Sequence, residues 1–210
     1  MTSRSAVVLS VLAGVSLLAA CGKPAEKPAA PEPPAAVQPA APEAPAPAAP
    51  AGVTKVAVTS THGAWPTADV PDFSAAKAVA YKDSSVGNAS VVVVLSTYEF
   101  PAANRAEFSK RTSPEKGQAR IELWLTRQKQ VAPGENLEFA AGMYDPTKAQ
   151  GQAEMTSSAE IAITGGTSLT FSQPQGTIEV TSVTADSISG KFDVKDKWTQ
   201  ISGEFSAPLK

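Results

Sequence analysis

The side chains best suited to chemistry are few and scattered in this chain. Cysteine and histidine occur once each among 210 residues, as Cys21 and His62. A single cysteine excludes an intrachain disulfide, and a lone histidine cannot build a multi-histidine metal site. As a general base, His62 would need a nucleophile and an orienting acid, which its neighbours in STHGAWP do not identify. We therefore expect His62 in a loop or at a strand end, without a catalytic role.

Serine and lysine recur at the Ser-x-x-Lys spacing of some acyl-transfer enzymes, as Ser74–Lys77 and Ser113–Lys116. A chain this rich in both residues contains such spacings by chance, and the companion motifs SDN and KTG are missing. Ser113 also precedes a proline, which disfavours the helix that this nucleophile normally occupies. These pairs do not predict an enzyme.

Acidic pairs are the remaining candidates for a site, at Asp69 with Asp72 and at Asp193 with Asp196. Neither pair has the dense, glycine-punctuated spacing of a calcium loop, so turns are the expected role. No glycine-rich phosphate loop is present. We expect no catalytic residue, metal or cofactor.

Cys21 follows an apolar run, Ala6–Ala20, that is preceded by the positive charge of Arg4 and is too short to span a bilayer. The run ends in Leu18-Ala19-Ala20-Cys21, which resembles the lipobox of bacterial lipoproteins. That resemblance implies a signal peptide over residues 1–20, lipidation of Cys21 with fatty-acyl chains such as palmitate, and attachment to a membrane. The alternative is an ordinary secretory signal with an incidental cysteine.

Gly22 occupies the position after this cysteine. In Gram-negative lipoproteins an aspartate there favours retention in the inner membrane. The resemblance therefore implies a lipid-anchored protein of the cell envelope, in the outer membrane of a Gram-negative bacterium.

Residues 23–52 are dominated by proline and alanine, with ten of the former and twelve of the latter. Proline at this density prevents helix and sheet, and so few apolar side chains cannot offset the entropy of ordering. Residues 21–52 are thus expected to be a lipidated N-terminus and a disordered linker, which would reach roughly 90 Å if fully extended as polyproline II. The alternative is a proline-rich ligand for a partner's aromatic groove.

Residues 53–210 have a globular composition and a length that suits one domain with its own core. The whole chain carries 18 basic and 20 acidic residues, for a formal net charge of −2. This balance gives no general attraction to nucleic acid, which we therefore do not expect as a partner.

Hydrophobic periodicity in this domain indicates strands separated by turns. Residues 90–97 form a β-branched run suited to a strand covered on both faces. Residues 120–126 alternate, with Glu122 and Trp124 opposite the apolar face, and residues 136–143 place Leu137, Phe139, Ala141 and Met143 on one face. We expect a mainly β fold, an antiparallel β-sandwich or barrel-like domain with at most one short helix.

Two turns are specific enough to predict hairpins. Gly165-Gly166 in IAITGGTSLTF suits a two-residue turn. The phrase Ile-Ser-Gly-x-Phe occurs at 188–192 and again at 201–205, and each copy has the alternation of a half-buried strand. If the two copies are antiparallel neighbours, Lys191 and Glu204 share the outer face and can form an ion pair.

The stretches 76–100 and 176–209 resemble uncharacterised bacterial secreted and lipid-anchored β-domain proteins. There a similar Ala-x-Ala-Tyr strand precedes a valine-rich strand, and a Ser-Gly-x-Phe strand ends the domain. The resemblance implies a fold and a location, but no activity.

The connection after residue 100 has the composition of a short helix, in FPAANRAEFSKRT. Residues 105–129 also carry seven basic side chains against three acidic ones. This excess suits contact with an anionic glycan, a lipid headgroup or an acidic envelope protein; the alternative is a solvated connector. The candidate contact residues are Arg105, Lys110, Arg111, Lys116 and Arg120.

Together these patterns favour a lipid-anchored envelope protein with a non-enzymatic binding or structural β-domain. One alternative is an enzyme acting on an envelope polymer through carboxylates that the fold brings together. Another is an accessory lipoprotein subunit of a secretion or transport assembly, with Trp65, Trp124 or Trp198 as an exposed anchor.

Overall fold

Strands dominate residues 54–210, the part of the chain that the computed structural model describes. They are β1 (Lys55–His62), β2 (Trp65–Pro66), β3 (Lys77–Ser85), β4 (Asn88–Ser96), β5 (Ala119–Gln128), β6 (Gly142–Tyr144), β7 (Met155–Ile163), β8 (Ser168–Thr170), β9 (Gln175–Val183), β10 (Ser187–Lys195) and β11 (Thr199–Pro208). Two 3-10 turns, Thr67–Asp69 and Thr164–Gly166, and one helix, α1 (Arg105–Phe108), complete the elements. The mainly β fold with a single short helix is confirmed.

The predictions for Cys21, for a signal peptide over 1–20 and for a linker over 21–52 lie outside the described residues.

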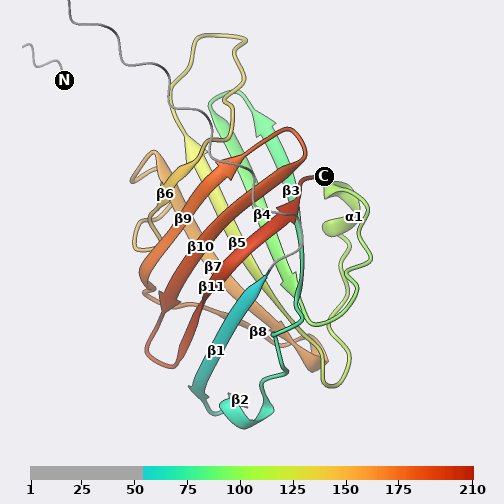
Figure 1. Cartoon of the computed structure of the whole chain (residues 1–210). Coiled ribbons are helices and arrows are strands. Elements are labelled where there is room, and N and C mark those ends of the chain that lie inside the picture. Colours follow the sequence, from blue (N-terminus) through green and yellow to red (C-terminus); the bar gives the residue numbers. More distant parts are fainter. Residues whose placement is uncertain (1–53) are drawn as a thin grey trace, which may run out of the picture. The chain divides into compact units, whose positions relative to one another are not determined.

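Two antiparallel sheets face each other (Figure 1). The first sheet has the order β2-β1-β11-β10-β9-β6, and the second has the order β3-β4-β5-β7-β8. Apolar side chains from the facing surfaces form one core, which includes Val93, Leu123, Ile178 and Ile201. Each such side chain contributes about 1.5–3 kcal/mol when it leaves water, so the two layers hold each other together.

The sheets meet at two corners through single parallel bridges. At one corner Leu209 pairs with Ala80, and Lys210 N donates to Ala80 O at 2.9 Å. At the other corner Asp145 pairs with Thr156. The chain's C-terminal residues are therefore bound to β3.

The repeated phrase forms the adjacent strands β10 and β11, in the antiparallel register that places Lys191 opposite Glu204. The ion pair differs from the prediction: Lys191 Nζ lies 2.9 Å from Glu179 Oε2, on the other neighbouring strand, β9. The hydrogen bond and charge of Glu179 raise the pKa of Lys191, and the charge of Glu204 adds to this effect. Lys191 thus sits between two carboxylates and bonds to one.

Gly203 in the second copy has a structural role. A Cβ there would lie 2.0 Å from Lys55 O on β1. The missing side chain is therefore what lets β1 approach β11.

Two local expectations are wrong. Residues 136–143 are strand only from Gly142, whose φ of +147° breaks the alternation, and Met143 is exposed while Tyr144 enters the core. The β7–β8 hairpin exists, but Thr164–Gly166 forms a 3-10 turn in place of a two-residue turn.

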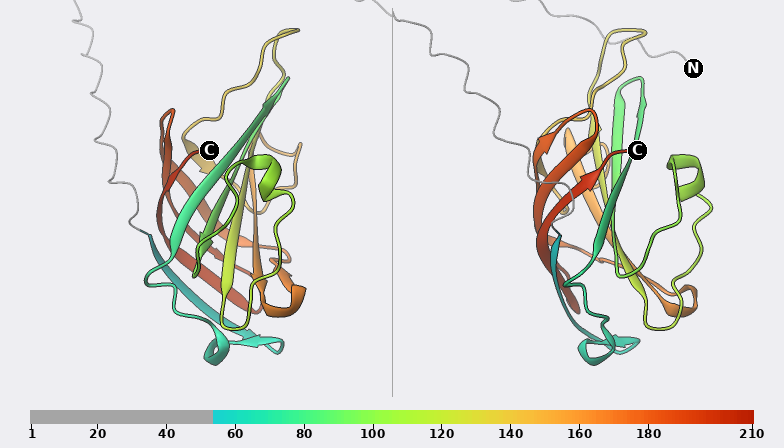
Figure 2. Two further views of the ribbon diagram at one scale, coloured as in Figure 1. Left: turned by 90° about the vertical axis from the view of Figure 1, so that its right-hand side faces the viewer. Right: turned by 45° about the vertical axis from the view of Figure 1, so that its right-hand side comes forward.

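The outer face of the second sheet is covered along β3, β4 and β5 by the β4–β5 connection, which carries α1. Figure 2 shows this connection on the side of the second sheet that faces away from the first. Phe108 of α1 is fully buried against Tyr81, Val92 and Val94. The valine-rich strand β4 is thus covered on both faces, as its sequence predicts.

Candidate functional site

The helix α1 holds the basic connection on the sheet. Asn104 caps α1 by accepting a hydrogen bond from Glu107 N at 3.0 Å, and Glu107 Oε2 accepts one from Ala103 N at 2.7 Å. Phe108 stacks on Tyr81 with ring centroids 5.2 Å apart and meets the edge of Trp124 at 5.7 Å. This single helical turn is therefore fixed by capping on one side and by aromatic packing on the other.

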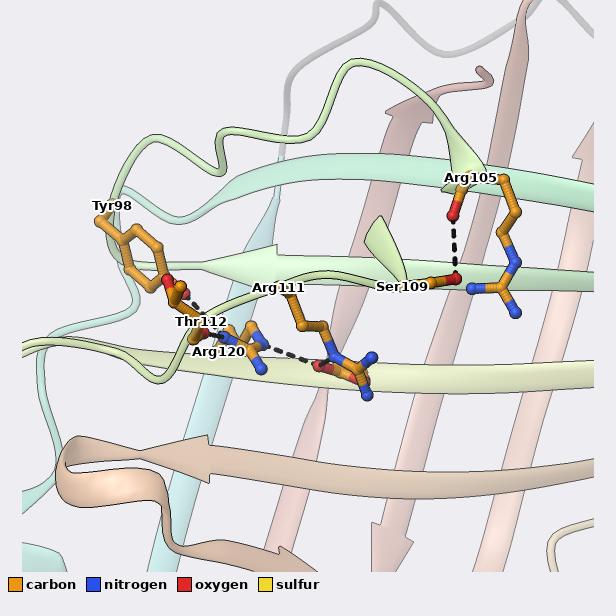
Figure 3. Close-up of polar contacts among 7 residues, drawn as sticks. Tyr98, Arg105, Ser109, Arg111, Thr112 and Arg120 are labelled. Atoms are coloured by element: carbon orange, nitrogen blue, oxygen red, sulfur yellow. Dashed lines mark hydrogen bonds and ion pairs between the residues drawn. The ribbon is translucent and has the colours of Figure 1, made fainter. Parts of the chain in front are cut away.

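Two arginines of the predicted anion-contact set converge on one buried carboxylate. Arg111 donates from Nε and Nη2 to the two oxygens of Glu122, at 2.8 and 3.1 Å, and Arg120 Nε donates to Glu122 Oε1 at 2.7 Å. The Glu122 side chain has no exposed area, and Arg120 is 5% exposed. Figure 3 shows Arg111 and Arg120 next to each other over the strands.

The Arg120 guanidinium has further partners. Its Nη1 donates to Tyr98 Oη at 3.1 Å and to Thr112 O at 2.6 Å. Burial lowers the pKa of Arg120, but the hydrogen bonds to Glu122 and Tyr98 outweigh this effect and raise it overall. Arg120 is a structural cation that joins the loop to β5.

The other three members of the set point elsewhere. Arg105 lies over the rings of Phe108 and Trp124, at 5.1 Å from each centroid, while Lys110 and Lys116 are exposed. Within residues 54–210, none of these three cations is bonded to a carboxylate. The structure therefore separates the set into two arginines engaged with Glu122 and three cations at the surface.

A groove of about 450 Å³ lies beside this covered region, where the outer face of the second sheet is open. Trp124 lines it from β5, together with Thr126, while Ser158 lines it from β7. The remaining lining residues are Pro146, Thr147, Lys148, Ala149, Gln150, Thr156, Ser157, Phe171 and Pro174.

The loop after β6 forms one wall of this groove. Gln150 Nε2 donates to Thr126 Oγ1 at 3.2 Å, and Thr147 donates to Asp145 Oδ1 from its backbone N and its hydroxyl, at 2.8 and 2.7 Å. The hydrogen bond from the Thr147 hydroxyl lowers the pKa of Asp145 most, and the bond from the Thr147 backbone N lowers it further. The loop after β6 is thus fixed by Asp145 where it begins, and the hydrogen bond from Gln150 attaches it to β5.

A second, smaller cleft of about 270 Å³ surrounds His62 and Trp198. Their rings meet edge-on with centroids 6.5 Å apart, and His62 Nδ1 accepts a hydrogen bond from Ala64 N at 3.2 Å. Asp196 Oδ1 accepts from the backbone N atoms of Trp198 and Thr199, both at 2.8 Å. His62 ends β1, as predicted, and Asp196 shapes a turn.

Side chains that suggested chemistry in the sequence are engaged in local structure. Ser74 donates to Asp72 from its backbone N and its hydroxyl, at 2.8 Å each, which lowers the pKa of Asp72. Lys77 pairs with Glu99. Ser74 and Lys77 therefore bond to other residues.

One acidic pair appears that the sequence alone does not indicate: Glu160 on β7 is the register partner of Glu122 on β5. Both oxygens of Glu122 accept hydrogen bonds from arginine. Within residues 54–210, no three His, Cys, Asp or Glu side chains are grouped in a way that could hold a metal ion.

Sequence reasoning missed both Glu122 as an acceptor and the groove. The position of Glu122 opposite an apolar face indicated an outer side chain, and nothing local shows that a loop covers it. The groove residues come from four separate segments, 124–126, 146–150, 156–158 and 171–174, so no single motif marks them; Trp124 was the one residue that the sequence singled out.

In the described part of the chain, no helix has the length and apolar character needed to cross a bilayer. Comparison of the chain with protein-family models, with curated proteins and with solved structures gives no match. Function must therefore be inferred from the chain's own residues.

Proposed function

We propose that this chain is a lipid-anchored protein of the bacterial cell envelope, in the outer membrane of a Gram-negative bacterium, whose β-domain is a non-enzymatic binding module. Cys21 would carry the lipid, and residues 21–52 would form the linker between the membrane and the domain. The support for the anchor is the sequence Leu18-Ala19-Ala20-Cys21 after an apolar run. Two or more acyl chains would hold the protein stably, since each buried methylene contributes about 0.8 kcal/mol.

The observation that carries the binding role is the groove beside Trp124. It is open, it joins an aromatic ring to hydroxyl and amide groups, and it lies against strands β5 and β7. Binding sites commonly combine a concave surface, an aromatic side chain and a few placed polar groups.

The neighbouring Arg111–Glu122–Arg120 cluster supports the same assignment. It fixes the β4–β5 connection on one half of the sheet's outer face, and Trp124 stands at the boundary with the open half. A fixed boundary keeps the groove in one shape, which limits the entropy lost when a partner binds.

The test is a comparison of wild type with Cys21→Ser in intact cells. Wild type should fractionate with membranes, and chemical crosslinking should capture an envelope component. Cys21→Ser should remain an unprocessed precursor or become soluble, while Ser3→Ala, in the same signal region, should behave as wild type. If Cys21→Ser fractionates with membranes as wild type does, the anchor is not at this cysteine.

A further inference from the structure

Two surface hollows of the domain share one lining residue, Phe171, whose side chain is 7% exposed and packs in the core. Phe171 lines both the groove beside Trp124 and the cleft beside Trp198. Both hollows lie along the β8 side of the second sheet, since residues 168–172 line one and Ser158 of β7 lines the other. The two hollows therefore adjoin at Phe171, and each is lined by one tryptophan, Trp124 in the groove and Trp198 in the cleft.

Hydroxyl groups are the commonest polar groups of this surface. The exposed ones are Thr147 and Ser158 in the groove and Ser168, Thr170 and Ser172 in the cleft, whereas Thr126, Thr156, Ser157 and Thr199 are buried. A hydroxyl can donate and accept hydrogen bonds at once. The hydroxyl groups of a sugar have the same property, so either partner can supply the proton in each contact.

The charge of the groove is positive and small. Lys148 is its one charged lining residue, and no carboxylate lines it. In the cleft, the Asp196 carboxylate already accepts backbone hydrogen bonds, and Lys197 Nζ lies over the Trp198 ring at 4.4 Å. This surface therefore suits a mostly neutral ligand with occasional negative charges.

Building on the proposed function, we propose that the Trp124 groove binds the glycan strand of the cell wall. Sugar rings have apolar faces suited to aromatic side chains, and polar rims suited to hydroxyl and amide groups. The acidic groups of cell-wall glycan would lie near Lys148. Repeated weak contacts along one polymer add up, because each later contact forms within an already bound complex.

An extended peptide fits this surface less well. Peptides added to a sheet gain specificity from pockets for alternate side chains, whereas this lining includes two prolines, Pro146 and Pro174, and several hydroxyl residues. The expected linker also favours the cell wall as the partner. A linker that reaches roughly 90 Å would let a membrane-anchored domain contact a polymer that lies away from the bilayer.

Ser158→Tyr is the sharpest test, because Ser158 is exposed on β7 and the new ring would fill the groove without entering the core. Thr177→Tyr is its matched control, because Thr177 is also an exposed strand residue, on β9 of the first sheet. Co-sedimentation of the full-length mature lipoprotein with purified cell-wall sacculi should lose about tenfold in affinity for Ser158→Tyr. Thr177→Tyr should bind as wild type.

Lys148→Gln gives a second, independent variant. It should weaken sacculus binding about threefold and reduce its salt dependence, because one charge contact is removed. Lys82→Gln, an exposed lysine on β3 outside the groove, should leave both unchanged.

Absence of wild-type binding to sacculi, or equal binding by Ser158→Tyr and Thr177→Tyr, would overturn the glycan assignment. So would binding to purified lipopolysaccharide in place of sacculi. A crosslinked protein partner at an intact groove would reject the glycan and leave the proposed function standing. Conversely, groove-dependent sacculus binding by a protein that is not lipidated at Cys21 would keep the glycan and reject the anchor.

Discussion

Arg111 holds both oxygens of Glu122, at 2.8 and 3.1 Å, across a separation of 11 residues. Arg120 binds the same carboxylate from the same strand, two residues away. A fully buried carboxylate with two guanidinium partners has its charge compensated, but each partner depends on the others. The β4–β5 connection is thereby attached to the sheet by a charge network beside its aromatic contacts.

The first prediction concerns this network. Glu122→Gln should lower the free energy of unfolding by about 3–5 kcal/mol, because the Arg120 guanidinium would stay buried beside a neutral partner. Arg111→Ala should cost less, about 2 kcal/mol, since Arg120 still pairs with the carboxylate. Urea denaturation followed by circular dichroism measures both.

Lys110→Gln provides the control for this series. Lys110 is exposed and lies one position before Arg111, so its loss should change stability by no more than about 0.5 kcal/mol. A further check is Arg120→Met combined with Glu122→Leu, which should be less destabilising than Glu122→Gln alone, because neither buried charge remains. A cost below about 1 kcal/mol for Glu122→Gln would contradict a structural role for the network.

The second prediction concerns the contact between β1 and β11. Gly203→Ala should destabilise the domain by about 1–3 kcal/mol, since its Cβ would lie 2.0 Å from Lys55 O and the strands must move apart. In Gly203→Ala, the backbone amides of β1 should exchange with solvent faster than in wild type, and this increase should be larger in β1 than in β4. Gly63→Ala is the matched control, because nothing lies within 4 Å of its Cβ position; equal effects of the two substitutions would refute the close approach.

The third prediction concerns stability in alkali. Burial, with a smaller contribution from the charge of Glu107, raises the pKa of Tyr81 to about 12. A raised pKa means that the unfolded chain loses this proton first, so the stability is fully present below about pH 10 and is lost as the pH rises to 12. The free energy of unfolding should fall by up to about 1.4 kcal/mol per pH unit for this group.

Tyr81→Phe tests the assignment. It should remove that part of the alkaline slope, and it should also cost stability at neutral pH, because Tyr81 donates a hydrogen bond of 2.6 Å to Ala102 O. Tyr144 will still contribute a slope, since its burial also raises its pKa. An unchanged slope in Tyr81→Phe would show that the phenol titrates alike in both states.

Much of the fold follows from local patterns. The repeated Ile-Ser-Gly-x-Phe phrase predicts two adjacent strands and the register of Lys191 with Glu204, because alternation sets the buried face and the short connection sets the partner. It does not predict that Lys191 bonds to Glu179, since the identity of the strand on its other side depends on the sheet order.

The candidate sites are harder to predict for the same reason. The alternation in β5 shows that Glu122 and Trp124 share a face, but the cover of that face comes from a distant loop that folds back over it. The number of basic residues in 105–129 indicates a basic segment. It does not indicate that Arg111 and Arg120 pair with the buried Glu122. The number of basic residues in this segment therefore overstates the positive charge that is available to bind a partner.

The last prediction uses the three tryptophans. Trp65 is 5% exposed in the core, whereas Trp198 is 46% exposed at the β10–β11 turn. Trp65→Ala should cost about 3–5 kcal/mol of stability, and Trp198→Ala should cost less than about 1 kcal/mol, because little apolar area is lost from the core. In variants that keep one tryptophan, with phenylalanine at the other two positions, acrylamide should quench Trp198 fluorescence most and Trp65 least. Equal quenching of these two would contradict the packing of the β1–β2 end of the domain, and with it the position of the cleft that Trp198 forms with His62.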